Sequence, residues 1–211
     1  MPSQPPKPTV MIPTDVHSFS RPFAEQHGAT AAVLLKFLAY KVRRSKNRRD
    51  EKFWFYNSAR KIAERVPYFS ASTISAQVTA LQGKGLLEIG NYNKWKQDRT
   101  KWFHVTEEVA QQVKADLISF DANVANEQGV LAAVLHYNLF YFIRLQVKKK
   151  VKAPQKLMSP KLLATLLPFC ESAIKNALKK LGDAGLIVKC KGARANYTLP
   201  PADLVTLGQM G

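Results

Sequence analysis

The spacing of apolar residues along the chain switches between a helical and a strand period. Residues 29–44 carry apolar side chains three or four positions apart, which predicts a helix with one buried face. A short aromatic stretch at 53–56 predicts a strand. Ser58 can cap the helix that follows, and Ser70 or Ser72 can cap the next one. The predicted order up to this point is helix, strand, helix, turn and helix.

A polar hairpin is predicted after the third of these helices. Apolar residues at 86–89 and 101–105 predict two strands, and the polar segment 90–99 predicts the loop that joins them. Three helices with a strand before the second and a strand hairpin after the third are the elements of a winged helix-turn-helix domain.

The chain repeats itself at an offset of about 100 residues. Residues 31–34 recur as residues 132–135, an offset of 101, and further matches continue as far as Pro67 and Pro168. Beyond that proline the offset is 100, as the loss of one turn residue would produce. The same fold is therefore predicted twice. The second copy is expected to contain helices at 128–147, 160–167 and 171–181, a strand at 156–158 and a hairpin at 186–199.

Together these patterns predict an α+β protein, mainly α, with tandem winged helix-turn-helix domains joined by a helical connector. The first residues are rich in proline and lack an apolar core, so they are expected to form a flexible arm. The expected parts are the arm at 1–20, winged helices at 21–106 and 123–201, the helical connector at 107–122 and a C-terminal tail at 202–211.

The charge of the chain predicts a polyanionic partner. Lys and Arg number 32 against 15 Asp and Glu, which gives a formal net charge of +17. Residues 21–120 carry 18 basic and 9 acidic side chains, and residues 121–211 carry 13 and 5. Each half is thus basic by itself, which indicates two basic folded surfaces rather than one basic tail.

The composition also predicts a compartment. Only two cysteines are present, no apolar run approaches the roughly 18 residues that span a bilayer, and the chain does not open with a secretory signal. We therefore expect a protein of the bacterial cytoplasm or nucleoid, with reduced thiols and no membrane partner.

Three stretches of the first copy carry a family resemblance. They are residues 55–58, residues 70–85, and Asn93 together with the Asp-Arg-Thr-Lys-Trp-Phe run at 98–103. Over about residues 22–106 the chain resembles the N-terminal winged-helix domain of phage and plasmid replication proteins. Residues 128–200 resemble a second, more generic winged helix. The resemblance implies binding to duplex DNA, with the third helix in the major groove and the hairpin loop as a wing.

The expected DNA contacts lie on the third helix and the hairpin loop of each copy. Family members tend to carry Lys or Arg on the outward side of the first copy's helix, where this chain has small, uncharged side chains, Ala80 among them. Lys and Asn on the second copy's helix can contact guanine, phosphate or adenine, so that helix is expected to supply the stronger base readout. The expected contacts in the first copy are Ser72, Thr73, Ser75, Ala76, Thr79, Asn93, Lys94, Trp95, Lys96, Arg99 and Lys101. Those in the second copy are Ser172, Lys175, Asn176, Lys179, Lys180, Lys189, Lys191 and Arg194.

The sequence predicts no catalytic residues, no cofactor and no metal site. The four histidines are scattered, and neither an HExxH pattern nor a glycine-rich phosphate loop is present. Cys170 and Cys190 lie twenty residues apart without a His or Cys at ligand spacing. The chain is therefore expected not to be an enzyme.

The leading hypothesis is a sequence-specific double-stranded DNA-binding protein of a phage or plasmid, acting at a replication origin or an operator. The alternative is a transcriptional repressor in which one winged helix serves for dimerisation or for docking a partner protein. The partners expected are duplex DNA and either a second copy of the chain or a protein of replication or transcription. Binding of structured RNA is a weaker third alternative.

Overall fold

A computed structural model of the chain describes residues 13–95, 97–98, 100–192 and 195–209. This part of the chain contains ten helices and four small sheets, so the α+β class is confirmed. The chain divides into two compact units. The N-terminal unit is Ser18–Ile118, and the C-terminal unit runs from Ser119 onward and includes the segment that ends at His17.

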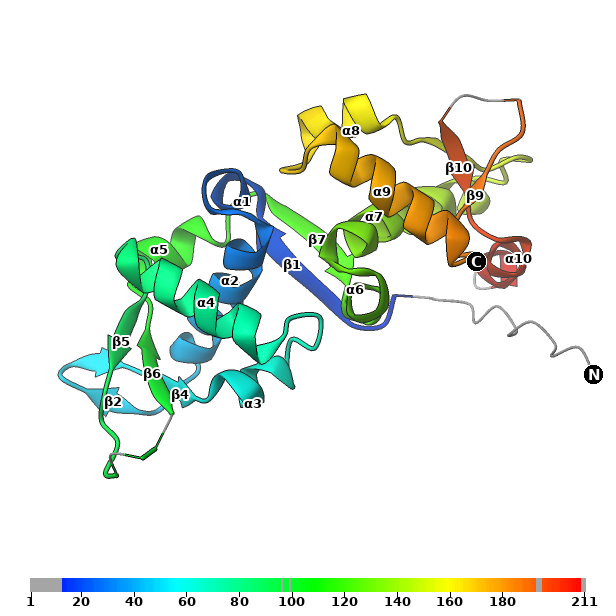
Figure 1. The fold of residues 1–211 in the computed structure, drawn as a ribbon. Helices are drawn as coiled ribbons and strands as arrows, with labels where there is room; N and C mark the ends of the chain where they lie inside the picture. Colours follow the sequence, from blue (N-terminus) through cyan, green and yellow to red (C-terminus); the bar gives the residue numbers. More distant parts are fainter. Residues whose placement is uncertain (1–12, 96, 99, 193–194, 210–211) are drawn as a thin grey trace, which may run out of the picture. The chain divides into compact units, whose positions relative to one another are not determined.

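Strand β1 (Val16–Ser20) leads into the N-terminal unit and pairs with β7 (Leu117–Asp121) in a two-stranded sheet. The remaining elements of the unit follow in chain order (Figure 1). They are α1 (Arg21–His27), α2 (Ala29–Arg43), β2 (Arg48–Arg49), β3 (Lys52–Phe53), β4 (Phe55–Asn57), α3 (Ala59–Ala63), α4 (Ala71–Gly83), β5 (Glu88–Gly90), β6 (Lys101–His104) and α5 (Glu107–Gln112).

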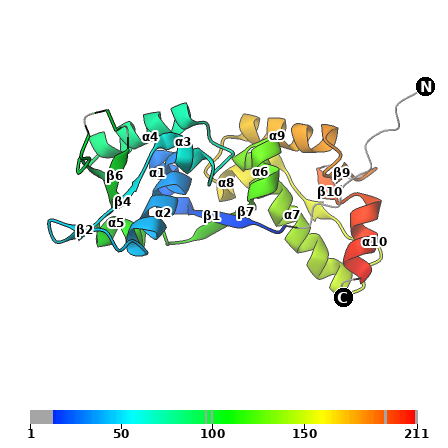
Figure 2. The same cartoon turned by 90° about the horizontal axis from the view of Figure 1, so that it is seen from below.

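The C-terminal unit has the same order of elements without the small β2–β3 hairpin (Figure 2). Its elements after β7 are α6 (Ala122–Gln128), α7 (Val130–Lys148), β8 (Lys156–Leu157), α8 (Pro160–Leu166), α9 (Glu171–Asp183), β9 (Val188–Lys189), β10 (Asn196–Thr198) and α10 (Pro201–Gln209).

The core of the N-terminal unit lies between its long helices and a three-stranded sheet of order β4-β6-β5. On α4 the buried residues Ile74, Val78 and Leu81 are three or four positions apart, so one side of the helix faces the core and the other faces solvent. Phe103 of β6 is paired with Phe55 and Ile89, and it is only 1% exposed. This packing leaves the outward side of α4 free.

The C-terminal unit repeats this packing around α7, which contacts α6, α9 and α10. Ile174, Leu178 and Leu181 of α9 are buried, and the sheet has the order β8-β10-β9. Among the described helices, α7 alone is long and apolar enough to cross a membrane. Eight of its residues are buried inside the unit, as expected for the core helix of a folded domain.

The two copies begin earlier than the sequence pattern indicated. Ser20 and Asp121, 101 positions apart, are the N-caps of α1 and α6. Gly28 (φ 85°) and Gly129 (φ 91°) end these helices with positive φ angles that suit glycine. The repeat therefore includes the strand before each cap, where Ser18 matches Ser119 and Phe19 matches Phe120.

Three expected boundaries are corrected by this arrangement. Residues 16–20 of the expected arm form β1. The expected helical connector at 107–122 consists of α5, which buries Val109 and Ala110, followed by strand β7. The expected tail at 202–211 contains most of α10, where Asp203 and Leu207 are buried. These segments are ordered because their own side chains are buried, a feature that short apolar stretches do not reveal in sequence.

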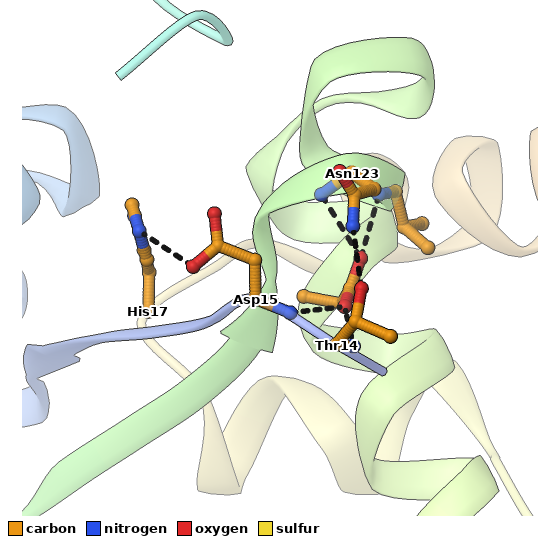
Figure 3. Close-up of polar contacts among 6 residues, drawn as sticks. Thr14, Asp15, His17 and Asn123 are labelled. Atoms are coloured by element: carbon orange, nitrogen blue, oxygen red, sulfur yellow. Dashed lines mark hydrogen bonds and ion pairs between the residues drawn. The ribbon is translucent and has the colours of Figure 1, made fainter. Parts of the chain in front are cut away.

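The side chain of Asp121 anchors the residues before β1 to the start of α6. It is 2% exposed, and its two oxygens accept hydrogen bonds from the backbone N–H groups of Thr14 (3.0 Å), Asp15 (3.4 Å), Asn123 (2.9 Å) and Val124 (3.0 Å). The Asn123 amide also donates to the Thr14 hydroxyl (3.1 Å), as Figure 3 shows. Residues 14 and 15 of the expected arm are therefore bound to the C-terminal unit.

Candidate nucleic-acid interface

The start of α4 is capped by a cluster of hydroxyls. Ser70 Oγ accepts from the Thr73 backbone N–H (3.1 Å) and lies 2.8 Å from both the Ser72 and the Thr73 hydroxyl oxygens. This cluster fixes the first turn of the helix. The Ser72 and Thr73 hydroxyls, both expected to contact DNA, already have partners within the protein.

The outward side of α4 is small and uncharged. Ser75, Ala76 and Thr79 are exposed, and the Thr79 hydroxyl donates to the Ser75 carbonyl (3.1 Å). Small side chains permit close approach of a partner and contact with thymine methyl groups. They cannot form a bidentate pair with a base, which requires a longer polar side chain.

A groove of about 610 Å³ lies between α4 and the β5–β6 hairpin. It brings Ser75 of α4 together with Asn93 and Lys101 of the hairpin, three residues that the sequence analysis had selected separately. Its other polar lining residues are Ser58, Arg60, Asn91, Asp98 and Thr100.

Asn93 holds the β5–β6 loop closed. Its amide nitrogen donates to the carbonyls of Asp98 (3.1 Å) and Thr100 (2.7 Å), and its amide oxygen accepts from the Trp102 indole N–H (2.8 Å). Both ends of the amide are thus used inside the loop. This arrangement explains why Asn93 occurs together with the 98–103 run, and it leaves the amide of Asn93 with partners inside the loop, so contact with DNA stays a prediction for this residue.

Asp98 contributes a negative charge to the groove. Its carboxylate accepts from the Thr100 backbone N–H (2.8 Å), and hydrogen bonds from Thr100 hold its pKa below the usual value. An ionised carboxylate repels phosphate, so this side of the groove is poorly suited to a DNA strand.

The basic and aromatic residues at the tip of the loop are exposed. Lys94 and Lys101 are open to solvent, and the Trp95 side chain is 75% exposed. None of these residues takes part in an ion pair in the described part of the chain, so they are available to a partner. Lys96 and Arg99, also expected contacts, lie outside the described residues.

The β2–β3 hairpin adds exposed arginines that the sequence analysis did not select. Arg48 and Arg49 are exposed on β2, and a Lys52–Glu88 ion pair (2.7 Å) links the hairpin to β5. The Tyr92 hydroxyl donates to the Asp50 carboxylate at the hairpin turn. Five basic residues stand at positions 43–49, which indicates exposed cations there, but residue type alone does not show that Arg48 and Arg49 form a strand.

In the C-terminal unit the outward side of α9 is basic. Lys175, Asn176 and Lys179 are exposed, whereas Ile174 and Leu178, on the opposite side of the helix, are buried. Lys175 forms an i,i+4 ion pair with Glu171 (3.4 Å), a partner that costs little to release because both side chains are largely exposed.

Lys180 has a different role from that expected. Its ammonium group donates to the Gln128 carbonyl at the end of α6 (2.9 Å), which satisfies a helix C-terminus in the same unit. This interaction points Lys180 toward α6 and makes it a weaker candidate for contact with DNA than Lys179.

The remaining candidates of this unit surround α9. The Ser172 hydroxyl lies 3.3 Å from Cys170 Sγ at the helix N-terminus, and this hydrogen bond lowers the pKa of the Cys170 thiol. Lys189 and Lys191 are exposed at the β9–β10 hairpin. Arg194, in the same loop, lies outside the described residues.

No group of three or more His, Cys, Asp or Glu side chains that could hold a metal ion occurs within the residues that the structure describes. No protein-family model matches the chain, and a search of curated proteins returned no relative.

We expect Asn93→Ala to destabilise the N-terminal unit by about 1–3 kcal/mol, because the indole N–H of Trp102 and two loop carbonyls lose their partner. Thermal unfolding followed by tryptophan fluorescence measures this loss, since all three tryptophans lie in that unit. Lys94→Ala, at an exposed neighbouring position, is the control. Equal melting temperatures for the two variants would contradict the role assigned to Asn93.

Proposed function

We propose that this chain is a sequence-specific duplex-DNA-binding protein of a phage or plasmid, built from two winged helix-turn-helix domains. The observation that carries the proposal is the outward side of α9, where Lys175, Asn176 and Lys179 are exposed and the opposite side is buried in the core. A helix of this kind can enter the major groove of DNA while the domain behind it stays folded.

The arrangement of elements supports the winged-helix interpretation. In each unit a short helix and a longer helix are separated by a turn and are followed by a strand hairpin. The strand before the short helix, β4 or β8, joins this hairpin as one edge of a three-stranded sheet. The hairpins β5–β6 and β9–β10 correspond to wings. The exposed lysines at both hairpins suit contact with the phosphate backbone that flanks a major-groove site.

The charge of the chain supports a nucleic-acid partner in the bacterial cytoplasm or nucleoid. The net charge of +17 is shared between both halves, and we place the protein at a replication origin or an operator, where a binding module without catalytic activity suffices. Selection from a random duplex library, followed by sequencing, tests the proposal. Enrichment of one motif is expected. Tighter binding to structured RNA than to any duplex would overturn it.

A second candidate function applies to the N-terminal unit alone. The small, uncharged outward side of α4 and the Asp98 carboxylate favour a unit that docks a protein or a second copy of the chain. A repressor that dimerises through this unit would still read DNA through α9. The selected motif distinguishes the two, since a dimer should select two half-sites in inverted orientation.

We expect Asn176→Ala to reduce the preference for the selected duplex over a scrambled one by about 5- to 150-fold, because a bidentate asparagine–adenine pair contributes about 1–3 kcal/mol of discrimination. Lys94→Ala should instead weaken binding to both duplexes by a similar factor, because a phosphate contact carries no sequence information. Fluorescence anisotropy with both duplexes measures these effects.

Asn138→Ala, an exposed asparagine on α7, is the matched control and should bind as the wild type does. If Ser75→Ala or Thr79→Val abolishes discrimination while Asn176→Ala leaves it unchanged, base readout belongs to α4, and the division of roles is reversed.

A further inference from the structure

A second cavity of the N-terminal unit has no role in the proposed DNA contacts. It has a volume of about 570 Å³ and lies among α2, α5 and the ends of β3 and β6. All of its lining residues belong to Ser18–Ile118, so the cavity is complete within one unit. Its volume falls within the range of about 300–1,000 Å³ typical of small-molecule sites.

The floor of this cavity is apolar and tightly packed. It is formed by Ala39 and Val42 of α2 and by Val105, Ala110 and Val113 near and on α5, all of which are buried. Tyr40 and Phe53 stand at the rim, and about half of each side chain is exposed. The His104 ring is held by a contact of its Nδ1 with the Phe53 carbonyl (2.9 Å). An aromatic ring of a ligand can pack against apolar and aromatic side chains of this kind.

Positive charge surrounds this apolar floor. Lys36, Arg43 and Lys114 line the cavity, against a single acid, Glu107. No ion pair in the described residues neutralises any of the three cations. The Lys36 ammonium donates to the Ser18 hydroxyl and is partly buried, and this burial lowers its pKa. An anion beside Lys36 would offset the cost of holding that charge away from water.

We propose that this cavity binds a small aromatic anion, with the ring against Val42, Ala110 and Phe53 and the charged group among the cations Lys36, Arg43 and Lys114. The apolar floor and the aromatic rim suit an aromatic ring, and the excess of cations over acids suits a negatively charged group. No residue of α4 or α9 lines the site, so it adds a small-molecule ligand to the function proposed above without depending on it.

The probe that tests the site is 2-naphthoate, titrated into the full chain by isothermal calorimetry in about 0.15 M salt, where exposed charges are largely screened. Saturable binding with one site per chain is expected. The uncharged analogue 2-naphthylmethanol has the same rings, so it should bind about tenfold more weakly, because it lacks the charge-assisted hydrogen bonds. Equal affinity for the two probes would overturn the proposal.

Variants locate the bound probe. Lys36→Met and Lys114→Met each keep the apolar stem and remove one charge, and each should weaken 2-naphthoate several-fold. Lys114 makes no described side-chain hydrogen bond, so its variant stays informative even if Lys36→Met disturbs the contact with Ser18. Lys41→Met is the control: it lies on α2 with its ammonium over the Phe37 and Tyr40 rings, and it does not line the cavity.

Each result of these titrations either supports or overturns the proposed site. Weakening by Lys36→Met and Lys114→Met with unchanged binding by Lys41→Met supports the site. Absence of saturable binding up to the solubility limit of the probe, or an equal effect of all three substitutions, overturns it. A failure of duplex selection leaves this result unaffected, because the titration contains no DNA.

Discussion

Affinity for duplex DNA is expected to fall by about 500-fold when salt rises from about 50 to 200 mM. Each phosphate contact contributes about −0.9 to the slope of log K against log salt, so about five contacts give a slope near −4.5. The exposed lysines of α9 and of the two hairpins supply contacts of this number. Fluorescence anisotropy titrations at four salt concentrations measure the slope.

Paired substitutions test which lysines produce this slope. Lys189→Ala combined with Lys191→Ala should reduce it by about 1.8, which corresponds to two phosphate contacts. Lys148→Ala combined with Lys149→Ala removes the same charge from exposed positions at the end of α7 and should leave the slope nearly unchanged. A shallow slope for the wild type, or equal slopes for the two paired variants, would contradict the proposed interface.

The C-terminal unit is expected to lose about 3 kcal/mol of stability between pH 7 and pH 4 because of one histidine. His136 of α7 is fully buried, and neither ring nitrogen has a hydrogen-bond partner in the described residues. Burial lowers the pKa of His136 from 6.5 to about 4, although the charge of Asp121 opposes the shift. The folded unit therefore favours the neutral form of the His136 ring.

The direction of the pH dependence of stability follows from which state, folded or unfolded, binds the proton first as the pH falls. Above pH 6.5 His136 is neutral in both states, and its effect on stability does not change with pH. As the pH falls from 6.5 to about 4, the unfolded chain binds a proton that the folded chain does not, so the free energy of unfolding decreases. A difference of about 2.5 pKa units corresponds to about 3 kcal/mol.

The chain itself suggests the control variant. Position 136 corresponds to Leu35 at the offset of 101, and Leu35 is also fully buried. His136→Leu should therefore fold and lose this part of the pH dependence. Urea unfolding at pH 7, 5.5 and 4.5 measures it, with far-UV circular dichroism for the whole chain and tryptophan fluorescence for the N-terminal unit alone. Parallel losses of stability in the wild type and the variant would rule out His136 as the cause.

The internal repeat shows how much of the fold can be predicted from the pattern of residues along the chain. Matches such as Pro67 with Pro168 predicted two copies of one fold, and the element order of the two units agrees. The copies begin at β1 and β7, where Ser18 matches Ser119 and Phe19 matches Phe120 at the same offset of 101, a match too short to define a strand. A strand of five residues is stabilised mainly by its partner strand, so its own sequence carries little signal.

The candidate site shows what the pattern of residues along the chain does not predict. Asn93 was expected to contact DNA because it stands among cations and aromatic residues, and the structure uses its amide to close the loop around Trp102. Lys180 was expected to face DNA, and it binds the Gln128 carbonyl. The partner of Lys180 is 52 residues away in the chain, and those of Asn93, 5 to 9 residues away, come within reach only when the loop folds; residue type and spacing specify neither arrangement.

Four features could be predicted from the sequence: the helix caps, the buried stripes of α4 and α9, the repeated order of elements and the basic charge of both halves. These features follow from side-chain spacing and from hydrogen bonds within a few residues. Three others became visible only in the folded structure: which polar side chains are bound within the protein, that residues 14–20 and 107–121 belong to folded units, and where α2 and α5 leave a cavity. Those properties depend on groups far apart in the chain, whose positions are set by packing of the whole unit.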